Sequence, residues 1–186
     1  MKNVEIASIS FKNQFLRLIW SFSYILFFRF TLRNAFAWRR IILKIFGAKL
    51  DTGAKIYATS RIWAPWNLEM GEDSVMGDYV NCYNVSHIRI GRKSIISQYS
   101  YLCTATHDFD VEEHNLMVAP IEIQDDAWVS ADCFIAPGTC IGFGSVVLAR
   151  STVLEDTDPW WVYGGYPAKA KRKRGWKRNH GEKVEK

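Results

Sequence analysis

The sequence has few cysteines and no long hydrophobic run, and each of these absences excludes a class of protein. Its cysteines form no CxxC pair and no other metal-ligand spacing (Cys82, Cys103, Cys133 and Cys140). We therefore expect buried, reduced thiols in a cytoplasmic protein, without disulfides and without a metal site. Within the apolar residues 15–47, the longest charge-free run, from Leu18 to Phe28, is shorter than the roughly 20 residues that a membrane-spanning helix needs. No apolar stretch near Lys2 and Glu5 leads to a cleavage site, so we expect no signal peptide.

The excess of basic residues is confined to the two ends of the chain. Residues 1–49 contain nine basic residues and one acidic residue, and residues 169–186 contain nine basic and two acidic residues. Residues 50–168 contain six basic and sixteen acidic residues, so the middle of the chain is acidic. A nucleic-acid-binding domain usually carries its Lys and Arg on one folded face, and we therefore expect no nucleic acid partner.

Residues 15–47 are apolar and aromatic, with basic residues at intervals. The basic residues recur where one side of a helix would be polar: Arg17, Arg29, Arg33, Arg39, Arg40 and Lys44. This pattern predicts an amphipathic helical extension over residues 1–49. Such an extension either lies in a membrane interface, attracted to anionic lipid, or packs on its own body or a neighbouring subunit, and the two arrangements are compatible.

A six-residue repeat dominates the second half of the chain. Aliphatic residues recur at every sixth position, and a small residue follows each of the first five by four places: Ile123, Val129, Ile135, Ile141, Val147 and Val153, followed by Ala127, Cys133, Thr139, Ser145 and Ser151. Shorter runs have the same spacing: Ile90, Ile96 and Leu102, and Met70, Met76 and Cys82. One unit is a short strand and a turn, and three units make one triangular coil. The repeat therefore predicts an all-β fold, a parallel β-helix over residues 50–160.

Glycine directly follows four of these aliphatic residues, at Gly71, Gly77, Gly91 and Gly142. We expect these positions to be tight corners that favour glycine.

The repeat is interrupted between Leu102 and Ile123, which predicts an ejected loop over residues 107–120. The loop begins with His107 and carries several carboxylates, among them Asp110. An imidazole at such an interruption is suited to remove a proton from a hydroxyl at neutral pH, and a nearby carboxylate can hold its tautomer. His87, which ends a repeat unit next to a shift in the repeat, is a further candidate, as a substrate-binding residue.

Several segments resemble the hexapeptide-repeat acyltransferases, and most closely the acetyltransferases of the colanic acid biosynthesis type. These segments are the repeats themselves, "SRIWAPWNLEMGE", "DYVNCYNV", "YLCTATHDFD" and the closing "VYGGYPAKAKRKR". The resemblance covers roughly residues 50–174. It departs from the family at a two-residue insertion between the runs that begin at Met70 and Ile90, which makes the alignment of Asn81 less secure.

The resemblance implies a left-handed β-helix, a homotrimer with active sites between subunits, and acetyl-CoA as co-substrate. It implies His107 as the catalytic base, Asp110 as its orienting group or a sugar ligand, and Asn81 as an acceptor ligand. The implied coenzyme-binding residues are Trp128, Ala131, Ala149, Gly164, Pro167, Lys169 and Arg172, the last four in a closing segment and basic tail over residues 161–186. The implied acceptor is a sugar hydroxyl of an exopolysaccharide or O-antigen unit, at the inner face of the cytoplasmic membrane.

Two other functions are compatible with a β-helix. A carbonic anhydrase would need a zinc site, for which His87, His107 and His114 are available outside the basic tail. A scaffold without catalytic activity would need none of these residues, and failure to bind acetyl-CoA would favour it.

Overall fold

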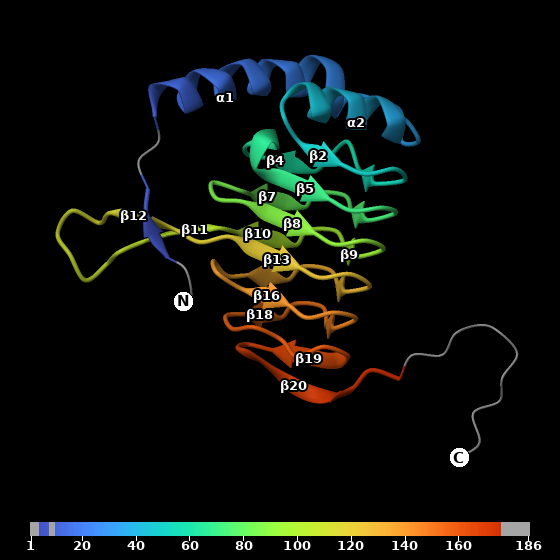
Figure 1. Ribbon diagram of the computed structural model, residues 1–186, viewed down its shortest axis with the longest axis vertical. Coiled ribbons are helices and arrows are strands. Elements are labelled where there is room, and N and C mark those ends of the chain that lie inside the picture. The colour runs from blue at the N-terminus through green and yellow to red at the C-terminus, as the bar shows by residue number, and fades with distance from the viewer. Residues whose placement is uncertain (1–3, 8–9, 176–186) are drawn as a thin grey trace, which may run out of the picture.

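The computed structural model describes residues 4–7 and 10–175 and forms a left-handed β-helix (Figure 1). Its strands stack into three parallel sheets. Sheet 1 contains β2 (Lys49–Leu50), β5 (Leu68–Met70), β8 (Ile88–Ile90), β13 (Ile121–Ile123) and β16 (Cys140–Ile141). Sheet 2 contains β3 (Lys55–Ile56), β6 (Val75–Met76), β9 (Ile95–Ile96), β14 (Trp128–Val129), β17 (Val146–Val147), β19 (Trp161–Gly165) and the antiparallel β20 (Ala168–Lys173). Sheet 3 contains β4 (Arg61–Ile62), β7 (Asn81–Tyr83), β10 (Tyr101–Cys103), β15 (Phe134–Ile135) and β18 (Thr152–Val153).

The repeated aliphatic residues form the core of the β-helix. Val129 pairs with Ile96 in one neighbouring coil and with Val147 in the other, and all three side chains are fully buried. The small residues that follow by four places are buried as well, as at Ser94, Ala127 and Ser145. A larger side chain would not fit there because the interior is close-packed. The six-residue repeat therefore marks the core correctly.

The corner glycines are required by the close approach of the neighbouring coil. Of the glycines that follow the aliphatic residues, none has a positive φ in the described chain. A Cβ on Gly91 would instead lie 2.5 Å from the backbone nitrogen of Asp125 in the next coil. The left-handed backbone occurs three places after the aliphatic residue, for example at Lys93 (φ 56°) and Asp126 (φ 56°).

The helical extension covers one end of the β-helix (Figure 1). It consists of α1 (Phe11–Ser23), a turn of π-helix, η1 (Tyr24–Arg29), and α2 (Phe36–Ile45). A short 3₁₀ turn, η2 (Pro65–Asn67), lies in the coils beneath. Trp20, Phe28 and Leu43 are buried in the same core as the first coils. One face of the extension therefore packs on its own β-helix.

Arg39 anchors α2 to the first coil. Its side chain is fully buried, and its guanidinium donates hydrogen bonds to the carbonyl oxygens of Ile56, Leu32 and Arg33 and to the hydroxyl of Thr31. Burial lowers the pKa of this guanidinium, while the four acceptors satisfy four of its five N–H donors. None of the described helices combines the length and the apolar composition that a membrane crossing would require.

Candidate active site

The segment ejected at the interruption of the repeat folds as a hairpin. Strands β11 (Ala105–His107) and β12 (Leu116–Val118) pair antiparallel, and β1 (Glu5–Ile6) adds a third strand beside β12. The hairpin leaves the β-helix where sheet 3 ends and sheet 1 begins, and it projects to one side (Figure 1). The paired strands hold His107 at a defined place on this projection.

His107 is oriented by a backbone carbonyl. Its Nδ1 lies 2.7 Å from the carbonyl oxygen of His114, across the hairpin. A carbonyl oxygen can only accept a hydrogen bond, so Nδ1 carries the proton and the neutral ring keeps a lone pair on Nε2. The side chain is exposed in the single chain. The geometry thus presents an imidazole nitrogen that can accept a proton.

Asp110 does not orient His107 in this structure. The Nδ1 partner is the His114 carbonyl, and within the described hairpin no hydrogen bond joins Asp110 to His107. The backbone N–H of Asp110 instead donates to the carboxylate of Asp108, which stabilises the exposed tip. The alternative role of Asp110, as a ligand of a sugar, stays a prediction.

Asn81 and His107 lie apart within one chain. Asn81 begins β7 and pairs with Arg61 on one side and with Tyr101 on the other. His107 follows Tyr101 by six residues of nearly continuous strand, which corresponds to about 20 Å at the rise of a β-strand. The two-residue insertion lies beyond Asn81, between Cys82 and Ile90, so it does not disturb the register of Asn81.

His87 lies at the root of the hairpin. Its carbonyl oxygen accepts a hydrogen bond from the backbone N–H of Ile121, where the chain re-enters sheet 1. Its Nε2 is 3.7 Å from the carboxylate of Glu69. His87 therefore shares a corner of the β-helix with the hairpin, although the structure brings it next to Glu69 and not next to Asn81.

The predicted coenzyme residues lie mostly along a different corner, between sheets 2 and 3. Ala131 and Ala149 occupy this corner in consecutive coils, and the backbone N–H of Arg150 donates to the carbonyl of Ala131 at 2.9 Å. The corner leads to a groove of about 520 Å³ lined by Phe134, Thr152, Leu154, Tyr166 and Pro167. Gly164, Pro167, Lys169 and Arg172 all belong to the closing hairpin of β19 and β20. The rest of the predicted basic tail, residues 176–186, lies outside the described residues.

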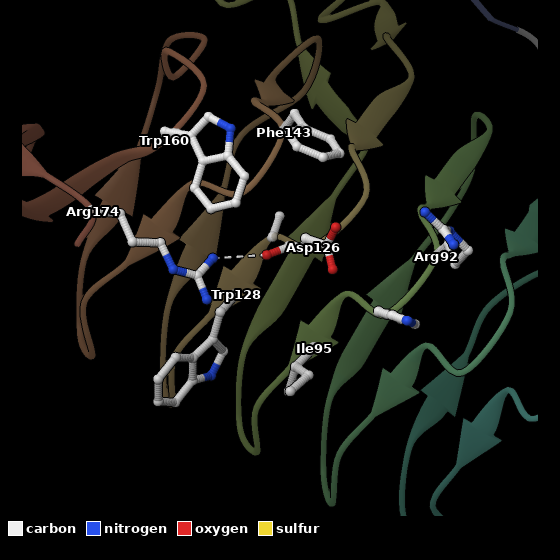
Figure 2. A pocket seen from close by; sticks show the side chains of 9 residues that line it. Arg92, Ile95, Asp126, Trp128, Phe143, Trp160 and Arg174 are labelled. Atoms are coloured by element: carbon white, nitrogen blue, oxygen red, sulfur yellow. Dashed lines mark hydrogen bonds between the residues drawn. The ribbon is translucent and has the colours of Figure 1, made fainter. Parts of the chain in front are cut away.

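Trp128 lies on the outer side of sheet 2, beside a second groove (Figure 2). Its indole Nε1 donates to the hydroxyl of Ser97 at 2.9 Å. The groove has a volume of about 600 Å³ and extends from Trp128 toward the corner between sheets 1 and 2, away from Ala131. Figure 2 shows Arg174 in this groove, where its guanidinium donates to the carbonyl of Asp126 at 2.8 Å.

Two tyrosines near Asn81 were not predicted as site residues. Tyr79 and Tyr99 stack face to face at the corner between sheets 2 and 3, with ring centroids 5.2 Å apart. Both have a left-handed backbone (φ 58° and 65°), and both rings are about half exposed. An aromatic residue in this conformation is strained, and strain of this kind gathers at functional sites. The available signal was their position three places after Met76 and Ile96, where most other coils have Asp, Lys, Arg or Gly.

Two thiols lie in the core of the β-helix and are unreactive. Burial raises the pKa of the Cys82 and Cys133 thiols, which keeps both protonated and poorly nucleophilic. No group of three or more His, Cys, Asp or Glu side chains in the described part of the chain is arranged to hold a metal ion.

Comparisons with known proteins identify the family. No family model matches the chain. It is 40% identical over 139 residues to the colanic acid biosynthesis acetyltransferase WcaF of Escherichia coli K12, covering 75% of this chain and 76% of the relative. A hexapeptide-repeat acetyltransferase of Vibrio cholerae has the same fold, with a TM-score of 0.78, 24% identity and coverage of 88% and 93%. A galactoside acetyltransferase in complex with coenzyme A superposes with a TM-score of 0.77, 20% identity and coverage of 97% and 93%. The chain belongs to the hexapeptide-repeat acetyltransferases and is an acyltransferase.

Proposed function

We propose that this enzyme transfers the acetyl group of acetyl-CoA to a sugar hydroxyl of an exopolysaccharide or O-antigen unit, with His107 as the general base. The observation that carries the proposal is the hydrogen bond between His107 Nδ1 and the His114 carbonyl, which leaves Nε2 ready to accept a proton. The similarity to a colanic acid acetyltransferase and to a galactoside acetyltransferase that holds coenzyme A supports the choice of both substrates.

In the proposed reaction, His107 Nε2 accepts the hydroxyl proton while the acceptor oxygen bonds to the thioester carbonyl carbon. The carbon–sulfur bond then breaks, and the imidazolium returns its proton to the leaving thiolate. The His114 carbonyl stabilises the imidazolium because its hydrogen bond from Nδ1 becomes charge-assisted. His107 thus moves one proton, and the chain supplies no covalent nucleophile.

The separation of the predicted site residues within one chain supports a homotrimer. His107 projects from the corner between sheets 3 and 1, whereas Ala131 and Ala149 lie at the corner between sheets 2 and 3. Three copies around an axis parallel to the β-helix can bring the hairpin of one subunit to the coenzyme corner of the next. We therefore place each active site between two subunits.

An exposed apolar stripe on the helical extension supports peripheral contact with the inner face of the cytoplasmic membrane. The stripe follows the helical repeat along α1 and η1: Phe11, Phe15, Leu18, Phe22, Leu26 and Phe30. Residues 6–50 contain no Asp or Glu, so the extension is strongly cationic. Apolar side chains beside cations suit a surface of anionic lipid.

The test is acceptor-dependent release of the coenzyme A thiol, measured with a panel of free sugars and lipid-linked glycans. We expect His107→Ala to lower kcat by roughly 10²–10⁴-fold, the usual loss for a general base. His114→Asn is the matched control, because it removes the second imidazole and keeps the backbone carbonyl that holds His107. Equal turnover by wild type and His107→Ala would exclude His107 as the base, and absence of both thiol release and coenzyme binding would favour the scaffold.

A further inference from the structure

A groove lies between the helical extension and sheet 3, away from the hairpin. It has a volume of about 350 Å³, within the range of small-ligand sites. Its walls come from α1, η1 and β4, with one neighbouring residue: Arg17, Trp20, Ser21, Tyr24, Ile25, Arg61, Ile62 and Trp63. The indole Nε1 of Trp20 donates to the carbonyl of Ile62 at 2.7 Å, which fixes α1 against β4. The groove is therefore part of the folded structure.

Two guanidinium groups line this groove without a neutralising carboxylate. Arg17 stacks on the indole of Trp63, with its Cζ 3.7 Å from the ring centroid. Stacking holds the guanidinium plane while its N–H edges stay available for a ligand. Arg61 is exposed on β4, and no ion pair in the described chain involves Arg17 or Arg61. Burial lowers the pKa of Arg17, as expected for a cation without a nearby anion.

The groove adjoins the predicted acceptor residue. Arg61 pairs with Asn81 across the two parallel strands β4 and β7, so the two residues are nearest neighbours on sheet 3. A ligand that contacts Asn81 therefore needs to extend by only one strand spacing, about 4.8 Å, to reach Arg61. A chemical group bound by Arg17 and Arg61 would therefore be part of the same acceptor molecule that contacts Asn81.

Apolar surface continues from the same groove along α1. Ile25 lines the groove and is 53% exposed, and the stripe residue Phe22 is 63% exposed. An adjacent groove on α1 shares Arg17 and Ser21 with it and is also lined by Gln14 and Leu18. The cations therefore lie at the border between the acceptor face and the exposed helix.

We propose that Arg17 and Arg61 bind the phosphate ester of a phosphorylated sugar acceptor. Planar guanidinium groups donate paired hydrogen bonds to phosphate oxygens, and two unneutralised cations favour a phosphate or diphosphate over a neutral sugar. This assignment rests on the proposed function for the identity of the acceptor. It makes sugars that carry a phosphate, on a nucleotide or on a lipid, the preferred substrate class.

The test measures binding directly, by calorimetric titration of the full chain with inorganic pyrophosphate while coenzyme A fills its own site. We expect binding by the wild type and a loss of at least tenfold in the double variant Arg17→Gln, Arg61→Gln, since a hydrogen bond to a charged group contributes about 1.5–3 kcal/mol. Lys55→Gln is the matched control, because it removes an exposed cation of the same coil from sheet 2. Arg17→Lys, Arg61→Lys should recover part of the binding.

A kinetic arm distinguishes this proposal from the acetyl transfer itself. The double variant should raise KM for a sugar phosphate at least tenfold and leave KM for the unphosphorylated sugar and kcat unchanged. Titration with uridine diphosphate and with micellar farnesyl diphosphate identifies the source, since the tighter ligand shows whether a nucleotide or a lipid carries the phosphate. No binding of pyrophosphate by the wild type, or equal binding by the folded double variant, would overturn the assignment whatever the outcome for acetyl transfer.

Discussion

The regular coils and the hairpin of residues 105–118 use their residues in opposite ways. In the coils, residues such as Ile96, Val129 and Val147 are buried, aliphatic and repeated, and none of them can donate or accept a proton. In the hairpin, His107 is exposed and is held by one hydrogen bond to a carbonyl. The difference teaches that the coils determine stability while the interruption supplies the proposed chemistry, so that each should respond to substitution separately.

The largest expected effect separates activity from stability at His107. His107→Ala should remove roughly 3–5 kcal/mol of transition-state stabilisation, the equivalent of its expected 10²–10⁴-fold loss in kcat. Its free energy of unfolding should change by less than about 0.5 kcal/mol, because the side chain is exposed. Chemical denaturation of the same preparation measures the second quantity, and a large loss of stability would show that the hairpin is part of the structural core.

The converse effect is expected in the coils. Ile135→Ala should lower the free energy of unfolding by roughly 2–5 kcal/mol, because Ile135 is fully buried and the substitution leaves a cavity. The kcat of the folded fraction should be unchanged. Thr152→Ala is the control, because Thr152 lies in the paired strand β18 but is only half-buried. It should lower the free energy of unfolding by much less. If the folded Ile135→Ala variant has a lower kcat, the coils also contribute to activity, and the division between the two regions does not hold.

Arg39 tests whether the helical extension belongs with the coils. Arg39→Met leaves buried carbonyl groups without their donor and should lower the free energy of unfolding by roughly 2–3 kcal/mol. Arg40→Met is a matched control in the adjacent position, since Arg40 makes one side-chain hydrogen bond within the described part of the chain, to the carbonyl of Ala54. Equal stability of the two variants in a denaturation experiment would mean that the extension is not anchored through Arg39.

The smallest effect concerns the outer face of the same extension. Phe22→Ser should weaken binding to vesicles of anionic lipid by about tenfold, or 1.4 kcal/mol. The variant has one aromatic side chain fewer to transfer from water into the lipid on binding. Its stability should be unchanged. Phe143→Ser, an exposed aromatic residue at the other end of the β-helix, is the control for sedimentation with vesicles. If the wild type does not bind vesicles, the proposed contact with the membrane is wrong.

The fold could be predicted from the sequence because each coil repeats the same local rule. Burial of one aliphatic residue in six, followed by a small residue, determines where the strands and corners lie. Gly91 was predicted as a corner position, but the atom that excludes a side chain there belongs to Asp125, 34 residues later in the sequence. A pattern within one coil contains no information about the distance to the next.

The site was less predictable because its contacts cross between segments. His107 was found from the interruption, but its partner is a backbone carbonyl, which any residue at position 114 would provide. A carboxylate such as Asp110 is visible in a sequence and a carbonyl is not. Arg17 and Arg61 likewise line one groove because Trp20 fixes α1 against β4, a contact between residues distant in the sequence.

The central claim is that the hairpin of one subunit completes a site on the regular corner of the next, and subunit complementation tests it most directly. His107→Ala removes the base, and Ala149→Trp fills the predicted coenzyme corner, so each variant alone should be inactive. Mixed trimers formed by co-expression in equal amounts should recover about a quarter of the wild-type sites, as random assembly of a closed ring predicts. Activity of the mixed trimers no higher than that of either parent would place each site within a single chain and contradict the account.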